Sequence, residues 1–136
     1  MPKILVIDDE PDFLLAVQMV LEANDFEMET ATTPEEGIDK VLSAKPDLVI
    51  LDVMMPTGYE GFDVAREIRE KHKLIELPIL MLTSIHKSKK VPYRFAPDEE
   101  YLPVDVFLDK PIEPEALVDT IREMLGERRE EPELPL

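Results

Sequence analysis

Short apolar runs recur along this chain, separated by polar stretches, and few folds can accommodate them. The runs are Ile4-Leu5-Val6-Ile7, Leu48-Val49-Ile50-Leu51, Ile79-Leu80-Met81-Leu82 and, interrupted by Asp105, residues 104–108. Because Val, Ile and Leu fill these runs without alternating with polar residues, the runs indicate strands that are covered on both faces. The segment 26–31 (FEMETA) alternates with a period of two, which is typical of a half-exposed edge strand. The runs therefore predict a mainly parallel sheet flanked by helices.

Between the runs, apolar residues recur at helical spacing. This spacing predicts a first helix over 11–23. Thr33 is suited to cap a second helix, and Glu36 is placed to complete a capping box. Helical spacing also predicts a third helix over 62–68 and a last one over 116–125. Strands that alternate with helices imply right-handed crossovers and a three-layer α/β sandwich.

Two segments do not fit this alternation. Residues 84–103 contain three prolines and leave no proline-free stretch long enough for a good amphipathic helix, so we expect mostly loop there. Residues 127–136 (ERREEPELPL) are polar, which is typical of a frayed tail. We therefore expect one domain over 1–126 and a polar C-terminal tail over 127–136.

The charge and composition exclude several classes of function. The 136-residue chain has 31 Asp and Glu against 15 Lys and Arg, a formal net charge of −16. This charge repels phosphate backbones and anionic headgroups, so we expect no direct contact with nucleic acid and none with membranes. The absence of Cys excludes thiol nucleophiles and Cys-ligated metal centres. The first apolar run is too short for a signal peptide or a membrane span, so we expect a cytoplasmic protein.

Polar residues follow each of the four apolar runs, and in a doubly wound fold ligands bind beyond the carboxyl ends of such strands. They are Asp8 and Asp9 after the first strand, Asp52 after the third, Thr83 after the fourth, and Asp109 and Lys110 after the fifth. Converging carboxylates repel one another unless a hard divalent cation such as Mg²⁺ or Mn²⁺ lies among them. Such a metal, together with a Lys and a hydroxyl, suits phosphoryl transfer. Asp52 stands alone after a central strand, so we expect it to be the phosphoryl acceptor and the Asp8-Asp9 pair to hold the metal.

Four motifs, taken in order, resemble those of response-regulator receiver domains of two-component signalling. They are Val6-Ile7-Asp8-Asp9-Glu10-Pro11, Leu51-Asp52-Val53-Met54-Met55-Pro56, Leu82-Thr83-Ser84 and Phe107-Leu108-Asp109-Lys110-Pro111. The resemblance covers about residues 2–126 and implies a flavodoxin-like receiver fold. In that fold a doubly wound, five-stranded parallel sheet has the strand order 2-1-3-4-5. It also implies a stand-alone phosphoacceptor switch, which is not an enzyme beyond catalysing its own phosphoryl transfer.

The resemblance further implies a phosphorelay, in which a sensor histidine kinase or a phosphotransfer protein donates a phosphoryl group to Asp52. Asp8 and Asp9 would bind Mg²⁺, or Mn²⁺, together with Asp52 and the backbone carbonyl of Met54. Lys110 would hold one phosphoryl oxygen. The downstream protein partner and the formation of a homodimer are left open by the sequence.

Two further residues have implied roles in switching. Thr83 would bond another phosphoryl oxygen, and Phe107 would turn inward as Thr83 moves, although a Phe in a last strand is as often a core residue. The side chains of Met54 and Ile85, two residues past Asp52 and Thr83, are apolar. Because neither can orient an attacking water, we expect slow self-dephosphorylation.

Two other functions compete with this one. The prolines of 84–103 lie where the family has its fourth helix, part of the face that docks partners. A receiver-like docking module that works without phosphorylation is therefore an alternative. A metal-dependent phosphohydrolase with an aspartyl nucleophile would require a second Asp two residues after Asp52, where Met54 stands.

Overall fold

The computed structural model describes residues 1–52, 60–83, 105–109 and 112–126. Its elements, in chain order, are β1 (Lys3–Ile7), α1 (Pro11–Ala23), β2 (Glu27–Ala31), α2 (Pro34–Ala44), β3 (Leu48–Asp52), α3 (Glu60–Arg66), the π-helical turn η1 (Glu67–Lys71), β4 (Ile79–Thr83), β5 (Val106–Asp109) and α4 (Pro114–Met124). The predictions that lie outside the described residues concern the loop at 84–103, the tail at 127–136, and Met54, Ile85 and Lys110.

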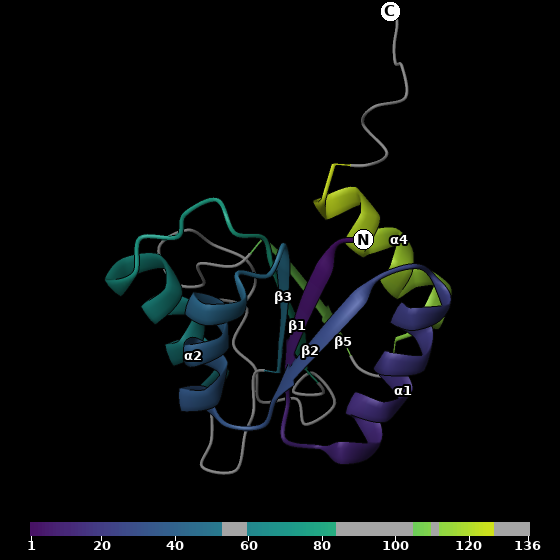
Figure 1. The fold of residues 1–136 in the computed structure, drawn as a ribbon, viewed down its shortest axis with the longest axis horizontal. Coiled ribbons are helices and arrows are strands. Elements are labelled where there is room, and N and C mark those ends of the chain that lie inside the picture. Colours follow the sequence, from purple (N-terminus) through teal and green to yellow (C-terminus); the bar gives the residue numbers. More distant parts are fainter. Residues whose placement is uncertain (53–59, 84–104, 110–111, 127–136) are drawn as a thin grey trace, which may run out of the picture.

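The described strands form one parallel sheet in the order β2-β1-β3-β4-β5. Helices α1 and α4 cover one face of this sheet, and α2 and the teal helix α3 cover the other (Figure 1). The predicted α/β sandwich with a parallel sheet is confirmed. Strand β2, which corresponds to the segment 26–31 predicted to be an edge strand, lies at one edge of the sheet.

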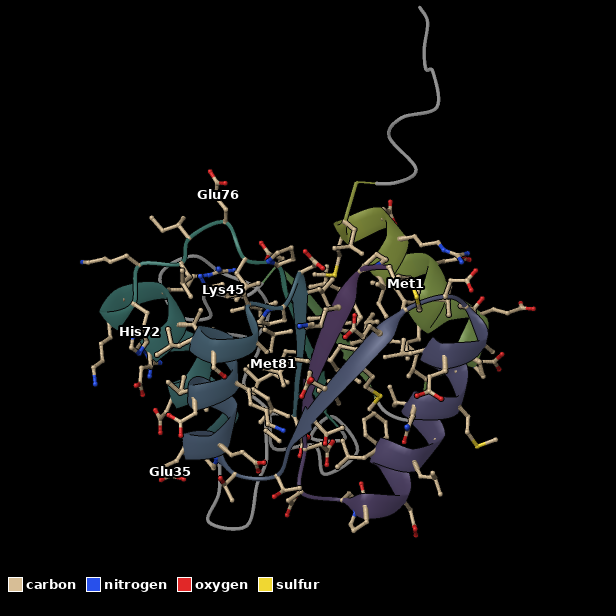
Figure 2. All side chains as sticks on the ribbon, in the orientation of Figure 1. Met1, Glu35, Lys45, His72, Glu76 and Met81 are labelled. Carbon is tan, nitrogen blue, oxygen red and sulfur yellow. The ribbon has the colours of Figure 1, made fainter. Side chains whose placement is uncertain are left out.

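Side chains of the sheet enter two hydrophobic cores, one on each face. On β1, Leu5 and Ile7 pack on the α2 side, whereas Ile4 and Val6 pack on the α1 side, and all four are 0% exposed. Met81 of β4 is likewise buried on the α2 side (Figure 2). Full burial of one such side chain contributes about 1.5–3 kcal/mol. The apolar runs do not alternate with polar residues because helices cover both faces of the sheet.

The second helix begins as its capping residues predict. The Thr33 hydroxyl accepts a hydrogen bond from the backbone N–H of Glu36 at 3.1 Å. In a capping box the Glu36 carboxylate would accept from the N–H of Thr33, but here it accepts from the N–H of Thr32 at 3.0 Å. This hydrogen bond from Thr32 lowers the pKa of Glu36 below its ordinary value, and the Lys40 ammonium lowers it further. The helix start was therefore predictable, but the partner of Glu36 was not.

Gly37 brings α2 close to β1. A Cβ atom at this buried position would lie 2.6 Å from Cδ1 of Ile7 and 3.1 and 3.2 Å from its Cγ1 and Cγ2. Real Cβ contacts are almost never that short, so a side chain here requires Ile7 to move. The absence of a side chain at Gly37 thus lets α2 pack closely behind the last residue of β1.

The outer edge of β2 is covered by a side chain from α2. The Lys40 ammonium donates a hydrogen bond to the carbonyl oxygen of Thr30 at 2.6 Å. It also lies 3.6 Å from carboxylate oxygens of Glu29 and Glu36. One carbonyl of the edge strand is thereby paired with a cation.

Two helices begin earlier than their apolar spacing predicts. Helix α3 begins at Glu60 rather than 62, and it continues into η1, where the N–H of His72 donates to the carbonyl of Glu67 at 3.1 Å. Helix α4 begins at Pro114 rather than 116, because proline suits the first turn of a helix even though it is not part of the apolar pattern. Within the described ranges, no helix has both the length and the apolar character needed to cross a membrane.

Candidate functional site

The parallel sheet brings the ends of its strands to one edge, the lower edge in Figure 1. Asp8 follows β1 directly and Asp52 is the last residue of β3. These two strands are neighbours, and Ile7 pairs with Leu51 in their register. Asp8 and Asp52, 44 positions apart in the sequence, are therefore adjacent in space.

Three carboxylates converge at this edge. One carboxylate oxygen from each of Asp8, Asp9 and Asp52 lies within 4.8 Å of the other two. Asp8 is 1% exposed and Asp52 is 7% exposed, whereas Asp9 is on the surface. Carboxylates held this close in a buried position repel one another, and a cation bound between them removes the repulsion. Three carboxylate oxygens are the donor set that a hard cation such as Mg²⁺ prefers, and they do not suit a thiophilic metal.

The backbone fixes the position of Asp8. Its N–H donates to the carbonyl of Ala31 at 2.9 Å, which continues the pairing of β1 with β2. Its Oδ1 accepts a hydrogen bond from the N–H of Glu10 at 2.9 Å, just before α1 begins. The carboxylate is thus held by the turn that leads from β1 into α1. The sequence could not indicate the hydrogen bond from Glu10 to Asp8, because its donor is a backbone N–H, which every residue except proline carries.

The outer strands contribute to the same edge. The register of the sheet places Asp52 opposite Leu82 and Thr83 opposite Asp109. The backbone of Thr83 therefore lies at the same edge as Asp52, and that of Phe107 lies two residues before the end of β5. The side chains of Thr83 and Phe107, and all of Met54 and Lys110, lie outside the described part of the chain. Their implied roles stay predictions.

A family model described as the response regulator receiver domain matches residues 4–122 of this chain. Among curated proteins, the alkaline phosphatase synthesis transcriptional regulatory protein PhoP of Bacillus subtilis is 34% identical over 130 residues, a match that covers 90% of this chain and 48% of the relative. The transcriptional regulatory protein ResD of the same organism is 35% identical over 123 residues, with the same two coverages. The chain spans about half the length of these relatives.

Solved structures agree with the sheet and helix arrangement. The response regulator TrrA of Thermotoga maritima, solved in complex with Mg²⁺-BeF, is 31% identical, and its TM-score is 0.74 with 91% of this chain and 99% of that chain covered. A chemotaxis response regulator of Vibrio cholerae is 29% identical, and its TM-score is 0.77 with 91% and 98% covered.

Proposed function

Because this chain belongs to the response regulator receiver domain family, we propose that it accepts a phosphoryl group on Asp52. The donor would be a sensor histidine kinase or a phosphotransfer protein, and the phosphorylated protein would signal by contact with another protein. Domains of this family are phosphoacceptor switches, and they bind Mg²⁺ at an acidic cluster. The observation that carries the proposal is the convergence of Asp8, Asp9 and Asp52 at the end of two central strands.

Asp52 fits the role of acceptor. It is the last residue of a central strand, and it lies beside an aspartate pair that can hold a cation. In the transfer step, an Asp52 carboxylate oxygen attacks the donor phosphorus as the donor's phosphorus–nitrogen bond breaks, and the bonding electron pair leaves with the donor imidazole. Mg²⁺, or Mn²⁺ in its place, would supply positive charge next to the phosphoryl oxygens.

The other predicted residues complete the proposed site. The Met54 carbonyl would join the metal ligands, Lys110 would bind one phosphoryl oxygen, and the Thr83 hydroxyl would bind another. Phe107 would change its side-chain position when Thr83 moves. The backbone register supports this set, because it brings the ends of β4 and β5 to the same edge as Asp52.

The proposal is tested by measuring intact mass after incubation with acetyl phosphate and Mg²⁺. Asp52→Asn removes the acceptor carboxylate with little change in shape. Asp39→Asn, at an exposed position on α2, is the matched control. We expect one phosphoryl adduct on the wild type and on the Asp39 variant, none on the Asp52 variant, and none when EDTA is present.

Two results would contradict the proposal in different ways. Equal phosphoryl uptake by the Asp52→Asn variant would show that another residue is the acceptor. A wild type that binds Mg²⁺ but takes no phosphoryl group from acetyl phosphate or from histidine kinases would instead favour a docking module that works without phosphorylation.

A further inference from the structure

The residue before β5 makes bonds that reach beyond its own strand. The N–H of Asp105 donates to the carbonyl of Ile79 at 3.0 Å, and its carboxylate Oδ2 accepts from the N–H of Ile79 at 2.9 Å. Asp105 therefore pairs with the first residue of β4 through both its backbone and its side chain. These two bonds extend the β4–β5 ladder by one position beyond the strand pairs from Leu80↔Val106 to Thr83↔Asp109.

Arg69 of η1 binds the same carboxylate. Its Nη2 donates to Oδ2 of Asp105 at 3.0 Å. Its Nη1 donates to the carbonyl oxygens of Leu74 at 2.6 Å and Leu77 at 2.7 Å. The Arg69 side chain is 12% exposed, so it is far less hydrated than a surface arginine, whereas the Asp105 side chain is 51% exposed. One guanidinium thus connects η1, the turn that leads into β4, and the start of β5.

Within the described residues, the register of β5 depends on three things: its pairing with β4, the packing of Val106 and Leu108 against the α1-side core, and this anchor at Asp105. The strand has four residues, lies at an edge of the sheet, and among the described strands it pairs only with β4. Residues 84–105 separate it from β4 in the sequence, a stretch that is too long for a tight hairpin turn to set the pairing. A slip by one residue would turn every side chain of β5 to the opposite face, and a slip by two would move the strand end by about 7 Å. Either slip would displace Asp109, and with it the point at which the chain reaches Lys110.

We propose that Arg69 and Asp105 are positioning residues, which hold β5 in register from the end of the sheet opposite the carboxylate cluster. This inference rests on the proposed phosphoryl transfer to Asp52 and on the proposed role of Lys110. The proposed metal ligands Asp8 and Asp9 follow β1, and two strands, β3 and β4, lie between β1 and β5 in the sheet. Loss of the Arg69–Asp105 pair should therefore impair the contribution of Lys110 and leave cation binding intact.

The chain offers a matched control on the neighbouring turn. Arg66 of α3 pairs with Asp63 at 3.3 Å, but these side chains are 45% and 78% exposed. An exposed pair of this kind contributes little to stability. Arg69→Met and Asp105→Asn are therefore compared with Arg66→Met. Arg69→Lys keeps the charge but lacks the planar fork whose two terminal nitrogens reach the two carbonyls and the carboxylate separately, so we expect an intermediate effect.

Three measurements are made on each variant: amide hydrogen exchange, Mg²⁺ affinity, and the rate of phosphorylation by acetyl phosphate. In Arg69→Met and Asp105→Asn we expect the β5 amides to exchange about tenfold faster, with the amides of the other edge strand, β2, unchanged. We expect the phosphorylation rate to fall about tenfold or more, with Mg²⁺ affinity unchanged. Arg66→Met should match the wild type in all three.

Each other outcome decides against a named part of the proposal. Equal acceleration of exchange in β2 and β5, or a parallel loss of Mg²⁺ affinity, would show a general loss of stability and overturn the positioning role. Unchanged β5 exchange would show that the pair does not hold the strand. If the wild type itself takes up no phosphoryl group, the proposed function fails, and the exchange measurement alone still decides whether the pair holds β5. Arg69→Lys keeps the test decisive if Arg69→Met does not fold.

Discussion

A single methyl group added at Gly37 tests how closely α2 packs on β1. The new Cβ would meet Ile7 at 2.6, 3.1 and 3.2 Å, and Ile7 is 0% exposed, so it cannot turn out into solvent to avoid the contact. Overpacking of this kind costs about 1–3 kcal/mol. Replacing a glycine inside a helix with alanine raises the free energy of unfolding by about 0.5–1 kcal/mol, because alanine loses less backbone entropy on folding. We therefore expect Gly37→Ala to lower the free energy of unfolding by about 1 kcal/mol.

A double-mutant cycle with Ile7→Val isolates the cause. Valine lacks Cδ1, the atom of Ile7 that the new methyl would contact most closely. Ile7→Val alone should cost about 0.5–1.5 kcal/mol through the lost methyl group. In the double variant the crowding is relieved, so its loss of stability should be smaller than the sum of the two single losses by about 1 kcal/mol.

The assay is urea unfolding followed by circular dichroism, with the slope of the transition checked for each variant. Ser43→Ala, at an exposed position of α2, controls for the change in helix propensity and should be neutral or slightly stabilising. Additive losses in the double variant, or a Gly37→Ala variant more stable than the wild type, would refute the close packing described above.

Three further predictions concern the site and the start of α2. Mg²⁺ should stabilise the wild type, by about 2.7 kcal/mol at a concentration one hundred times its dissociation constant, and Asp8→Asn should remove most of this gain in a thermal unfolding assay. Because the pKa of Glu36 is lowered in the folded state, its contribution to stability is present above its ordinary pKa of 4.5 and is lost as the pH falls through the lowered value. Wild type and Glu36→Gln should therefore differ in stability at neutral pH and converge in acid, and a constant difference would contradict the bond from Thr32. Finally, the apolar side chain of Met54 predicts that the phosphorylated protein decays slowly and that Met54→Asn decays faster; a wild-type half-life of seconds, followed by intact mass, would contradict this.

The sequence predicts those parts of the molecule that depend on local pattern or on the parallel topology. Runs such as 48–51 identify strands because helices cover both faces of the sheet, and a parallel sheet then carries Asp8 and Asp52 to one edge. The cap at Thr33 is likewise local, because donor and acceptor are three residues apart.

Contacts between distant residues could not be predicted in the same way. Arg69 and Asp105 are 36 positions apart, and the residues around each of them form no pattern that predicts their pairing. The close approach at Gly37 depends on the path of α2 over Ile7, which no spacing within α2 specifies. Lys110 and Met54 lie outside the described residues, so their roles stay predictions that the phosphorylation experiments test, and the loop predicted at 84–103 lies outside the described residues as well.

The Lys40 contact on β2 has a consequence for how the protein behaves at high concentration. An edge strand carries unpaired backbone groups that can recruit a strand from another molecule, the first step of aggregation into fibres. The ammonium of Lys40 bonds the Thr30 carbonyl, which faces away from β1, and the acidic Glu29 lies on the same strand. To pair at this edge, the β2 strand of a second molecule would have to displace Lys40. It would also bring its own charged side chains toward the same charges on the first molecule. Lys40 of α2, the helix that packs on the neighbouring strand, therefore opposes self-association at the β2 edge of the sheet.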